Sequence, residues 1–230
     1  MATVQQEAIK LRTNIDSVYE AGKKAEYGEF WDLYQNNGNR NSCINLFSGV
    51  GWNDVTFNPK NSMQNITLAN AMFGSSQITD LQAILDKCNV VFNFSNCNNF
   101  VNMINGSSIT RLGVINTNSS SQLTNAFYDG QKLKTIDKLI LSSTGTQTFS
   151  STFYNCKALE NIVIEGVIGN SLDIRYSTKL THDSLMSIIN ALKDYSANQG
   201  AHTLTIGDVN IAKLTKEEIN LIESKGWNYQ

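Results

Sequence analysis

The cysteines and histidines are the side chains of this sequence best suited to metal binding or nucleophilic chemistry. The two histidines are His182 and His202, and neither has a cysteine or carboxylate at ligand spacing. No pair of cysteines forms a CxxC motif or a zinc pattern. We therefore predict buried, reduced thiols, with a structural disulfide or a reactive thiol as the alternative. The four cysteines are Cys43, Cys88, Cys97 and Cys156.

The carboxylates show no arrangement typical of a hydrolase. Glu217 and Glu218 fall in the first turn of a predicted helix, where negative charge complements the helix dipole. The sequence contains no GxSxG, P-loop, GxGxxG or calcium-loop motif. We predict no catalytic residue, no cofactor, no metal and no enzymatic activity. A glycan hydrolase is the enzyme alternative, and no residue pattern favours it.

Composition argues against nucleic-acid and membrane partners. The chain has 230 residues, 41% hydrophobic and 17% charged, with a net charge of −2 and no run of Lys or Arg. Such a chain lacks the basic surface that phosphates or anionic lipids require. No apolar run approaches the roughly 20 residues of a membrane span, and no secretory signal is recognisable at the N-terminus. We expect the product to remain in the cytoplasm of the producing cell or to leave it by lysis, unless a signal has been trimmed.

An internal repeat organises the middle of the chain. The stretches FSSTFYNCKALENIVI (149–164) and LTNAFYDGQKLKTIDK (123–138) share an apolar rhythm, in which an anchor is followed by apolar residues six and nine positions later. A small residue lies three after each anchor, at Ser75, Gly106, Gly130 and Cys156. The four anchor frames are Met72, Ile78 and Leu81; Met103, Ile109 and Leu112; Phe127, Leu133 and Ile136; and Phe153, Leu159 and Ile162.

The period predicts the fold class. The anchors are 31, 24 and 26 residues apart, and self-similarity in this range is typical of solenoids whose stacked units share one core. About one residue in eight is Asn, which suits tight corners between units. We therefore predict an α/β solenoid with short strands, in which the anchors are core residues.

The motifs NAFYDGQKLKTIDKLIL and STFYNCKALENIVIEGVI resemble the BspA-like branch of leucine-rich repeats, whose units run A-F-x-x-C-x-x-L-x-x-I-x-[IL]. The resemblance covers residues 66–180 at most and is sharpest over 122–168. Met72 and Met103 stand where the family has Phe. The long interval between them holds TDLQAILDKC, with helical spacing, and VVFNF, which alternates like a strand.

The ends of the chain differ from the middle. Residues 3–35 carry a helical stripe and an aromatic cluster, predicting either a cap on the first unit or an attachment helix. Residues 35–60 are rich in Asn and Gly and indicate a structured loop or an incomplete first coil, with Trp52 and Phe57 beneath it or exposed for binding. The predicted domains are a helical attachment or capping segment (1–60), a leucine-rich-repeat solenoid (61–180) and a C-terminal cap (181–230).

The C-terminal segment predicts a helix, strand, helix order. Thr181 is the expected N-cap of a helix over 181–196, and HTLTIG reads as a strand. Thr215 and Glu218 form a capping box, Gly226 ends the helix, and WNYQ adds a last short strand.

The end segments, AGKKAEYGEFWDLYQNNGNR and HTLTIGDVNIAKLTKEEINLIESKGWNYQ, are similar to those of leucine-rich-repeat minor structural proteins of phages of gut bacteria. This resemblance implies a non-enzymatic virion protein, attached to other virion proteins by the N-terminal segment, with a surface for a host glycan or protein. It also suggests a possible homo-oligomer. The alternative is a bacterial BspA-like cell-surface adhesin. The expected attachment residues are Ile15, Tyr19 and Trp31, and the candidate binding residues are Asn93, Arg111, Lys138, Arg175 and Tyr176.

Overall fold

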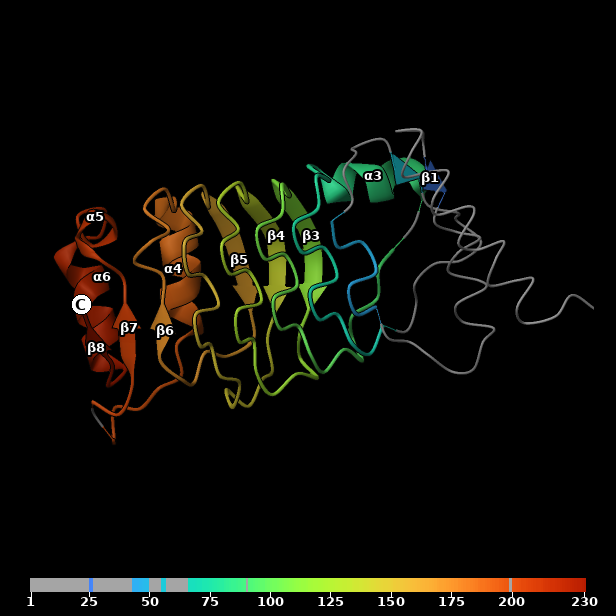
Figure 1. The fold of residues 1–230 in the computed structure, drawn as a ribbon. Helices are drawn as coiled ribbons and strands as arrows, with labels where there is room; N and C mark the ends of the chain where they lie inside the picture. The colour runs from blue at the N-terminus through green and yellow to red at the C-terminus, as the bar shows by residue number, and fades with distance from the viewer. Residues whose placement is uncertain (1–24, 27–42, 50–54, 57–65, 90, 199) are drawn as a thin grey trace, which may run out of the picture.

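The computed structural model describes residues 25–26, 43–49, 55–56, 66–89, 91–198 and 200–230. Along these residues the elements follow one another from the blue N-terminal part to the red C-terminal part (Figure 1). The first two are β1 (Ala25–Glu26) and β2 (Val55–Thr56), a parallel pair. The later elements are α3 (Leu81–Cys88), β3 (Arg111–Asn116), β4 (Thr135–Ile140), β5 (Asn161–Glu165), β6 (Leu172–Asp173), α4 (His182–Ala191), β7 (Thr203–Thr205), α5 (Asp208–Ile211), α6 (Lys216–Ser224) and β8 (Asn228–Tyr229).

The predicted fold class is wrong. We expected one α/β solenoid of stacked leucine-rich-repeat units, whereas the described strands form separate parallel sheets, ordered β1-β2, β3-β4-β5 and β6-β7-β8. Two of these sheets have three strands and the other has two. Among the described residues between β2 and β3, neighbouring turns are joined by isolated β-bridges, such as that of Leu68 with Asn99, and not by paired strands.

A helix explains where the β3-β4-β5 sheet stops. Helix α4 lies beside β5 in the position that a fourth strand would occupy (Figure 1). The Ile162 N–H donates to the Ser184 hydroxyl oxygen at 3.0 Å, and the Ile164 N–H donates to that of Ser187 at 2.8 Å. Because these hydroxyls satisfy the edge of β5, the sheet does not continue into β6.

The predicted core residues are confirmed. All twelve residues of the four anchor frames are buried, with exposed fractions of 3% or less. On the strands they also meet in register, since Leu112 pairs with Ile136 and Ile136 with Ile162. Full burial of one such side chain stabilises a protein by roughly 1.5–3 kcal/mol relative to exposure, so these columns hold the sheet together.

The turns before the strands repeat more regularly than the sheets do, and they correct the predicted register. The Phe47 N–H donates to the Met72 carbonyl, the Phe73 N–H to that of Met103, and the Phe127 N–H to that of Thr152. Phe73 and Ile104, rather than Met72 and Met103, are therefore the equivalents of Phe127 and Phe153. The rings of Phe47 and Phe73 stack at 5.2 Å and those of Phe127 and Phe153 at 5.3 Å. Residues 43–49 form a further turn of the same kind.

Positive φ angles define these turns. Each turn has two residues with positive φ, four positions apart, in the left-handed region that Gly, Asn and Asp tolerate best. This requirement accounts for part of the Asn and Gly content. Ala71, Ser75 and Ser151 occupy the same region without that tolerance. The pairs are Asn45 and Gly49, Ala71 and Ser75, Asn102 and Gly106, Asn125 and Asp129, and Ser151 and Asn155.

Most predicted local elements after residue 66 are present. Helix α3 and strands β7 and β8 lie where expected, and Thr181 and Thr215 cap α4 and α6, the latter with the full capping box. VVFNF is the exception: Phe92 and Phe94 are buried in alternation, but the described part of this stretch forms no strand. No helix among the described residues is long and apolar enough for a membrane span.

Candidate functional site

A row of three tyrosines is the most prominent aromatic feature on the described surface. Tyr128 and Tyr154 follow Phe127 and Phe153 at the same position of successive turns, and their rings stack at 5.0 Å. Tyr176 continues the row, with its ring 4.8 Å from that of Tyr154 in an edge-to-face arrangement. Tyr154 is 41% exposed and Tyr176 is 37% exposed. We call Tyr128, Tyr154 and Tyr176 the tyrosine row.

The turns fix the spacing of this row. Asn125 and Ser151, both with positive φ, begin two turns of the same shape, which are joined through backbone hydrogen bonds. The Asn155 amide nitrogen donates to the Asp129 carboxylate across the two turns. The tyrosine side chains therefore project from a backbone that is already ordered before any ligand binds, which lowers the entropy cost of binding.

The chemistry of the row suits recognition of a partner. The Tyr128 and Tyr154 ring faces contact each other, so the row offers ring edges and phenol hydroxyls to a ligand. None of the three hydroxyls hydrogen bonds to a described residue. The Arg175 guanidinium lies 5.8 Å from the Tyr176 ring centre and adds a cation at one end. Tyr and Arg are among the side chains most enriched at binding hot spots.

The cations predicted for the binding surface are each paired with a carboxylate. Arg111 makes a bidentate contact with Asp137 at 3.0 and 2.8 Å. Lys138 lies 2.8 Å from a Glu165 oxygen. The carboxylate of Asp137 raises the pKa of Arg111 by hydrogen bonding and by charge. The exposed face of the β3-β4-β5 sheet is therefore a set of cross-strand ion pairs, flanked by the exposed side chains of Val114 and Val163.

The other predicted residues are distributed as follows. Arg175 pairs with Asp173 at 2.7 Å, and the adjacent Tyr176 belongs to the tyrosine row. Asn93 is half-buried, and its side-chain oxygen accepts from the Ser95 N–H at 2.9 Å. The structure thus brings Arg175 and Tyr176 together at the tyrosine row, and it places Arg111 and Lys138 on the strand face. The attachment residues Ile15, Tyr19 and Trp31 lie outside the described residues, as do Trp52 and Phe57.

The cysteines occupy structural positions. All four are free thiols, and Cys43, Cys97 and Cys156 are buried, as predicted, whereas Cys88 is only half-buried. Burial raises the pKa of Cys97 to about 11 and that of Cys156 to about 12. The Cys156 thiol donates to the Phe127 carbonyl at 3.0 Å. Within the part of the chain that the structure describes, no group of His, Cys, Asp and Glu could hold a metal ion.

His182 connects two helix starts, a role that the sequence did not reveal. Its Nε2 lies 2.8 Å from a Glu218 carboxylate oxygen, which joins the first turn of α4 to that of α6. The Thr215 N–H and His182 both lower the pKa of Glu218. His202 packs against the rings of Tyr195 and Trp227, at 4.7 and 5.4 Å, and those two rings lie 6.1 Å from each other.

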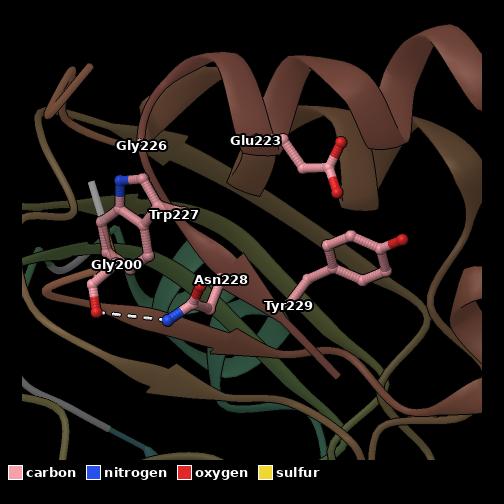
Figure 2. A pocket seen from close by; sticks show the side chains of 6 residues that line it. All are labelled: Gly200, Glu223, Gly226, Trp227, Asn228 and Tyr229. Atoms are coloured by element: carbon pink, nitrogen blue, oxygen red, sulfur yellow. Dashed lines mark hydrogen bonds between the residues drawn. The ribbon is translucent and has the colours of Figure 1, made fainter.

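A hollow of about 350 Å³ lies at the C-terminal end (Figure 2). The Glu223 side chain of α6 and the Tyr229 ring of β8 face each other across it, and Asn228 turns toward Gly200, whose carbonyl accepts its amide hydrogen bond at 3.2 Å. Gly226 and Trp227 complete the lining. From the sequence alone, this stretch is predicted only to cap the fold.

Comparisons with protein-family models, with curated proteins and with solved structures find no match to this chain. Sequence reasoning found only Tyr176 of the tyrosine row. The signal for the rest was present, because AFYDG and TFYNC carry Tyr at the same repeat position.

Proposed function

We propose that this chain is a non-enzymatic binding protein that contacts its partner through the tyrosine row. The observation that supports this proposal is the line of one half-buried and two exposed phenol rings, 5.0 and 4.8 Å apart, with hydroxyls that make no hydrogen bond to described residues. Tyrosine supplies a large amphipathic contact area at a low cost in side-chain entropy.

The tyrosine row is a better candidate than the ion-paired strand face. A ligand for Arg111 or Lys138 would first have to displace Asp137 or Glu165, whereas the phenol hydroxyls need only release water. We therefore expect the row to supply more of the binding energy than the strand face.

We also propose that the chain is part of a phage virion. The resemblance of its end segments supports a place in a phage virion, with residues 1–60 attached to other virion proteins and the tyrosine row turned toward a host-surface glycan or protein. A bacterial surface adhesin would use the same row after export. Labelling of purified phage particles with an antibody against this chain separates the two, since only a virion protein is found on them.

Binding of the purified chain to intact gut bacteria and to a glycan array tests the function. We expect saturable binding to a defined strain or glycan. The double variant Tyr128→Ala/Tyr154→Ala should weaken it at least tenfold, since each hot-spot aromatic contributes more than 1 kcal/mol.

The control is Arg111→Ala/Lys138→Ala, which removes two cations of the strand face and leaves the tyrosine row intact. We expect it to change binding less than threefold. If the strand-face variant loses binding and the tyrosine variant keeps it, the row is not the contact surface. Absence of binding by the folded wild-type chain to every strain and glycan would overturn host recognition.

A further inference from the structure

Strand β8 has β7 as its one partner among the described strands, so its other edge is not paired by any of them. Strand β8 pairs with β7 through Asn228 and Gln230, whose N–H groups donate to the carbonyls of His202 and Leu204 at 3.0 and 3.3 Å. In a parallel pair alternate residues face the partner strand. Tyr229 therefore directs its own N–H and C=O away from β7, and neither group hydrogen bonds to any described residue.

The β3-β4-β5 sheet shows how this molecule covers an edge elsewhere. On the β5 side, the hydroxyls of Ser184 and Ser187 accept the outward N–H groups. On the β3 side, Asp80, the N-cap of α3, forms a bridge with Arg111. No such element covers β8 in the described structure. An uncovered edge is the feature that recruits a strand from another chain.

The hollow lies beside this edge, and the negatively charged side chain of Glu223 lines it (Figure 2). Glu223 and Tyr229 both line it, so a strand placed against Tyr229 would bring one of its side chains to Glu223. The Glu223 carboxylate is exposed and forms no ion pair or hydrogen bond with a described residue. A cationic side chain would complement it.

We propose that the open edge of β8 binds an extended segment of another protein by strand addition, with a Lys or Arg side chain of that segment in the hollow beside Glu223. The backbone of the segment hydrogen bonds to the N–H and C=O of Tyr229, and its basic side chain sets the register. This site shares no residue with the tyrosine row, so it goes beyond the function proposed above.

Selection of peptides on the full chain tests this directly. A displayed library of random nine-residue peptides, selected against the wild-type chain and counter-selected against Tyr229→Pro, should yield peptides with Lys or Arg at one fixed position. Proline removes an N–H that hydrogen bonds to none of the described residues, and an edge strand tolerates proline there. We expect Tyr229→Pro and Glu223→Lys each to weaken binding of a selected synthetic peptide at least tenfold.

Two controls distinguish strand addition from binding through the Tyr229 ring or through the tyrosine row. Tyr229→Ala keeps the N–H and loses only the ring, so it should weaken binding much less than Tyr229→Pro does. The selected peptide, N-methylated at successive positions, should lose binding at alternate positions, a readout independent of how any variant folds. Tyr154→Ala, in the tyrosine row, should bind the peptide as the wild type does.

Three results would overturn the proposal. Peptides that bind Tyr229→Pro as well as the wild type would exclude the edge. Selected peptides without a basic position, or unaffected by Glu223→Lys, would exclude the role of the hollow. A fall in the solution mass of the chain on Tyr229→Pro, measured by light scattering, would show that a second copy occupies the edge instead.

Discussion

The Ser184 hydroxyl oxygen lies 3.0 Å from the backbone nitrogen of Ile162, and this contact marks the end of the β3-β4-β5 sheet. The same hydroxyl donates to the Glu160 carbonyl at 3.1 Å and also receives a hydrogen bond from the Thr181 hydroxyl. Together with Ser187, this helix side chain takes the place of the backbone of a missing strand.

Ser184→Ala should therefore destabilise the protein more than a typical helix substitution. The variant leaves the buried Ile162 N–H without an acceptor, and an unsatisfied buried group costs about 1–3 kcal/mol. Urea unfolding followed by circular dichroism measures the change. Ser224→Ala is the control, because among the described residues the Ser224 hydroxyl bonds only to the Leu221 carbonyl, at its own exposed helix end. Equal stability of the two variants would show that the Ser184 contact is dispensable.

Lys225→Met should also destabilise the fold, through the C-terminus of α4. The Lys225 ammonium donates to the carbonyls of Ile189, Asn190 and Leu192 at 3.0, 2.8 and 3.0 Å. A cation there satisfies groups that the helix leaves unpaired and complements its dipole. We expect a loss of about 2 kcal/mol, since hydrogen bonds to charged groups contribute about 1.5–3 kcal/mol.

The matched control is Lys216→Met, at the first residue of α6, where the helix dipole disfavours a cation. This variant should be neutral or slightly more stable than the wild type in the same urea titration. A loss as large as that of Lys225→Met would point to a general effect of removing surface charge.

Ala71→Gly should stabilise the protein. Ala71 has a φ of 46°, and a residue with a Cβ costs roughly 1–2 kcal/mol more than glycine in this region. Because glycine also gains entropy in the unfolded chain, we expect a net gain of up to about 1 kcal/mol in thermal or urea unfolding. Ala126→Gly is the control: Ala126 lies in the equivalent turn without a positive φ and is buried, so the same change there should be destabilising.

These turns also show how far the sequence could predict the fold. The period was readable because each turn needs an aromatic or aliphatic residue between two positions that tolerate positive φ. The sequence did not show which residue of each turn is equivalent to Phe127, because Met72 and Phe73 are both apolar and both fully buried. The backbone hydrogen bonds, which assign Phe73 to the column of Phe127, have no sequence signal of their own.

The division into separate sheets was equally hidden from the sequence. Ser184 and Ser187 look like ordinary polar residues of an amphipathic helix, and nothing in their identity shows that they satisfy the edge of β5. Capping signals at Thr181, Thr215 and Gly226 succeeded because they depend on neighbouring residues only. Local chemistry was predictable here, and contacts across distant segments were not.

The tyrosine row illustrates the same limit at the candidate site. Ile174 and Ser177 share the backbone pattern of Phe153 and Cys156, so Arg175 takes the position of Tyr154 in its turn. Tyr176 nevertheless reaches the Tyr154 ring from the next position along the chain. A strict repeat alignment therefore excludes Tyr176, although the side chains form one row.

Because the thiols are buried, we expect the free energy of unfolding to fall at alkaline pH. Burial raises the pKa of Cys156 from 9.0 to about 12, so between these values the thiol ionises in the unfolded chain but stays protonated in the folded one. The stabilising contribution is complete below pH 9 and is lost as pH rises toward the folded pKa. At pH 10 one such thiol lowers the free energy of unfolding by about 1 kcal/mol. Cys156→Ala should reduce the fall in urea-unfolding free energy between pH 7.5 and pH 10, under reducing conditions, by about that amount.

Leu159→Ala is a matched core substitution without a titrating group. It should keep the wild-type pH dependence, and a wild-type pH dependence in Cys156→Ala as well would refute the assignment.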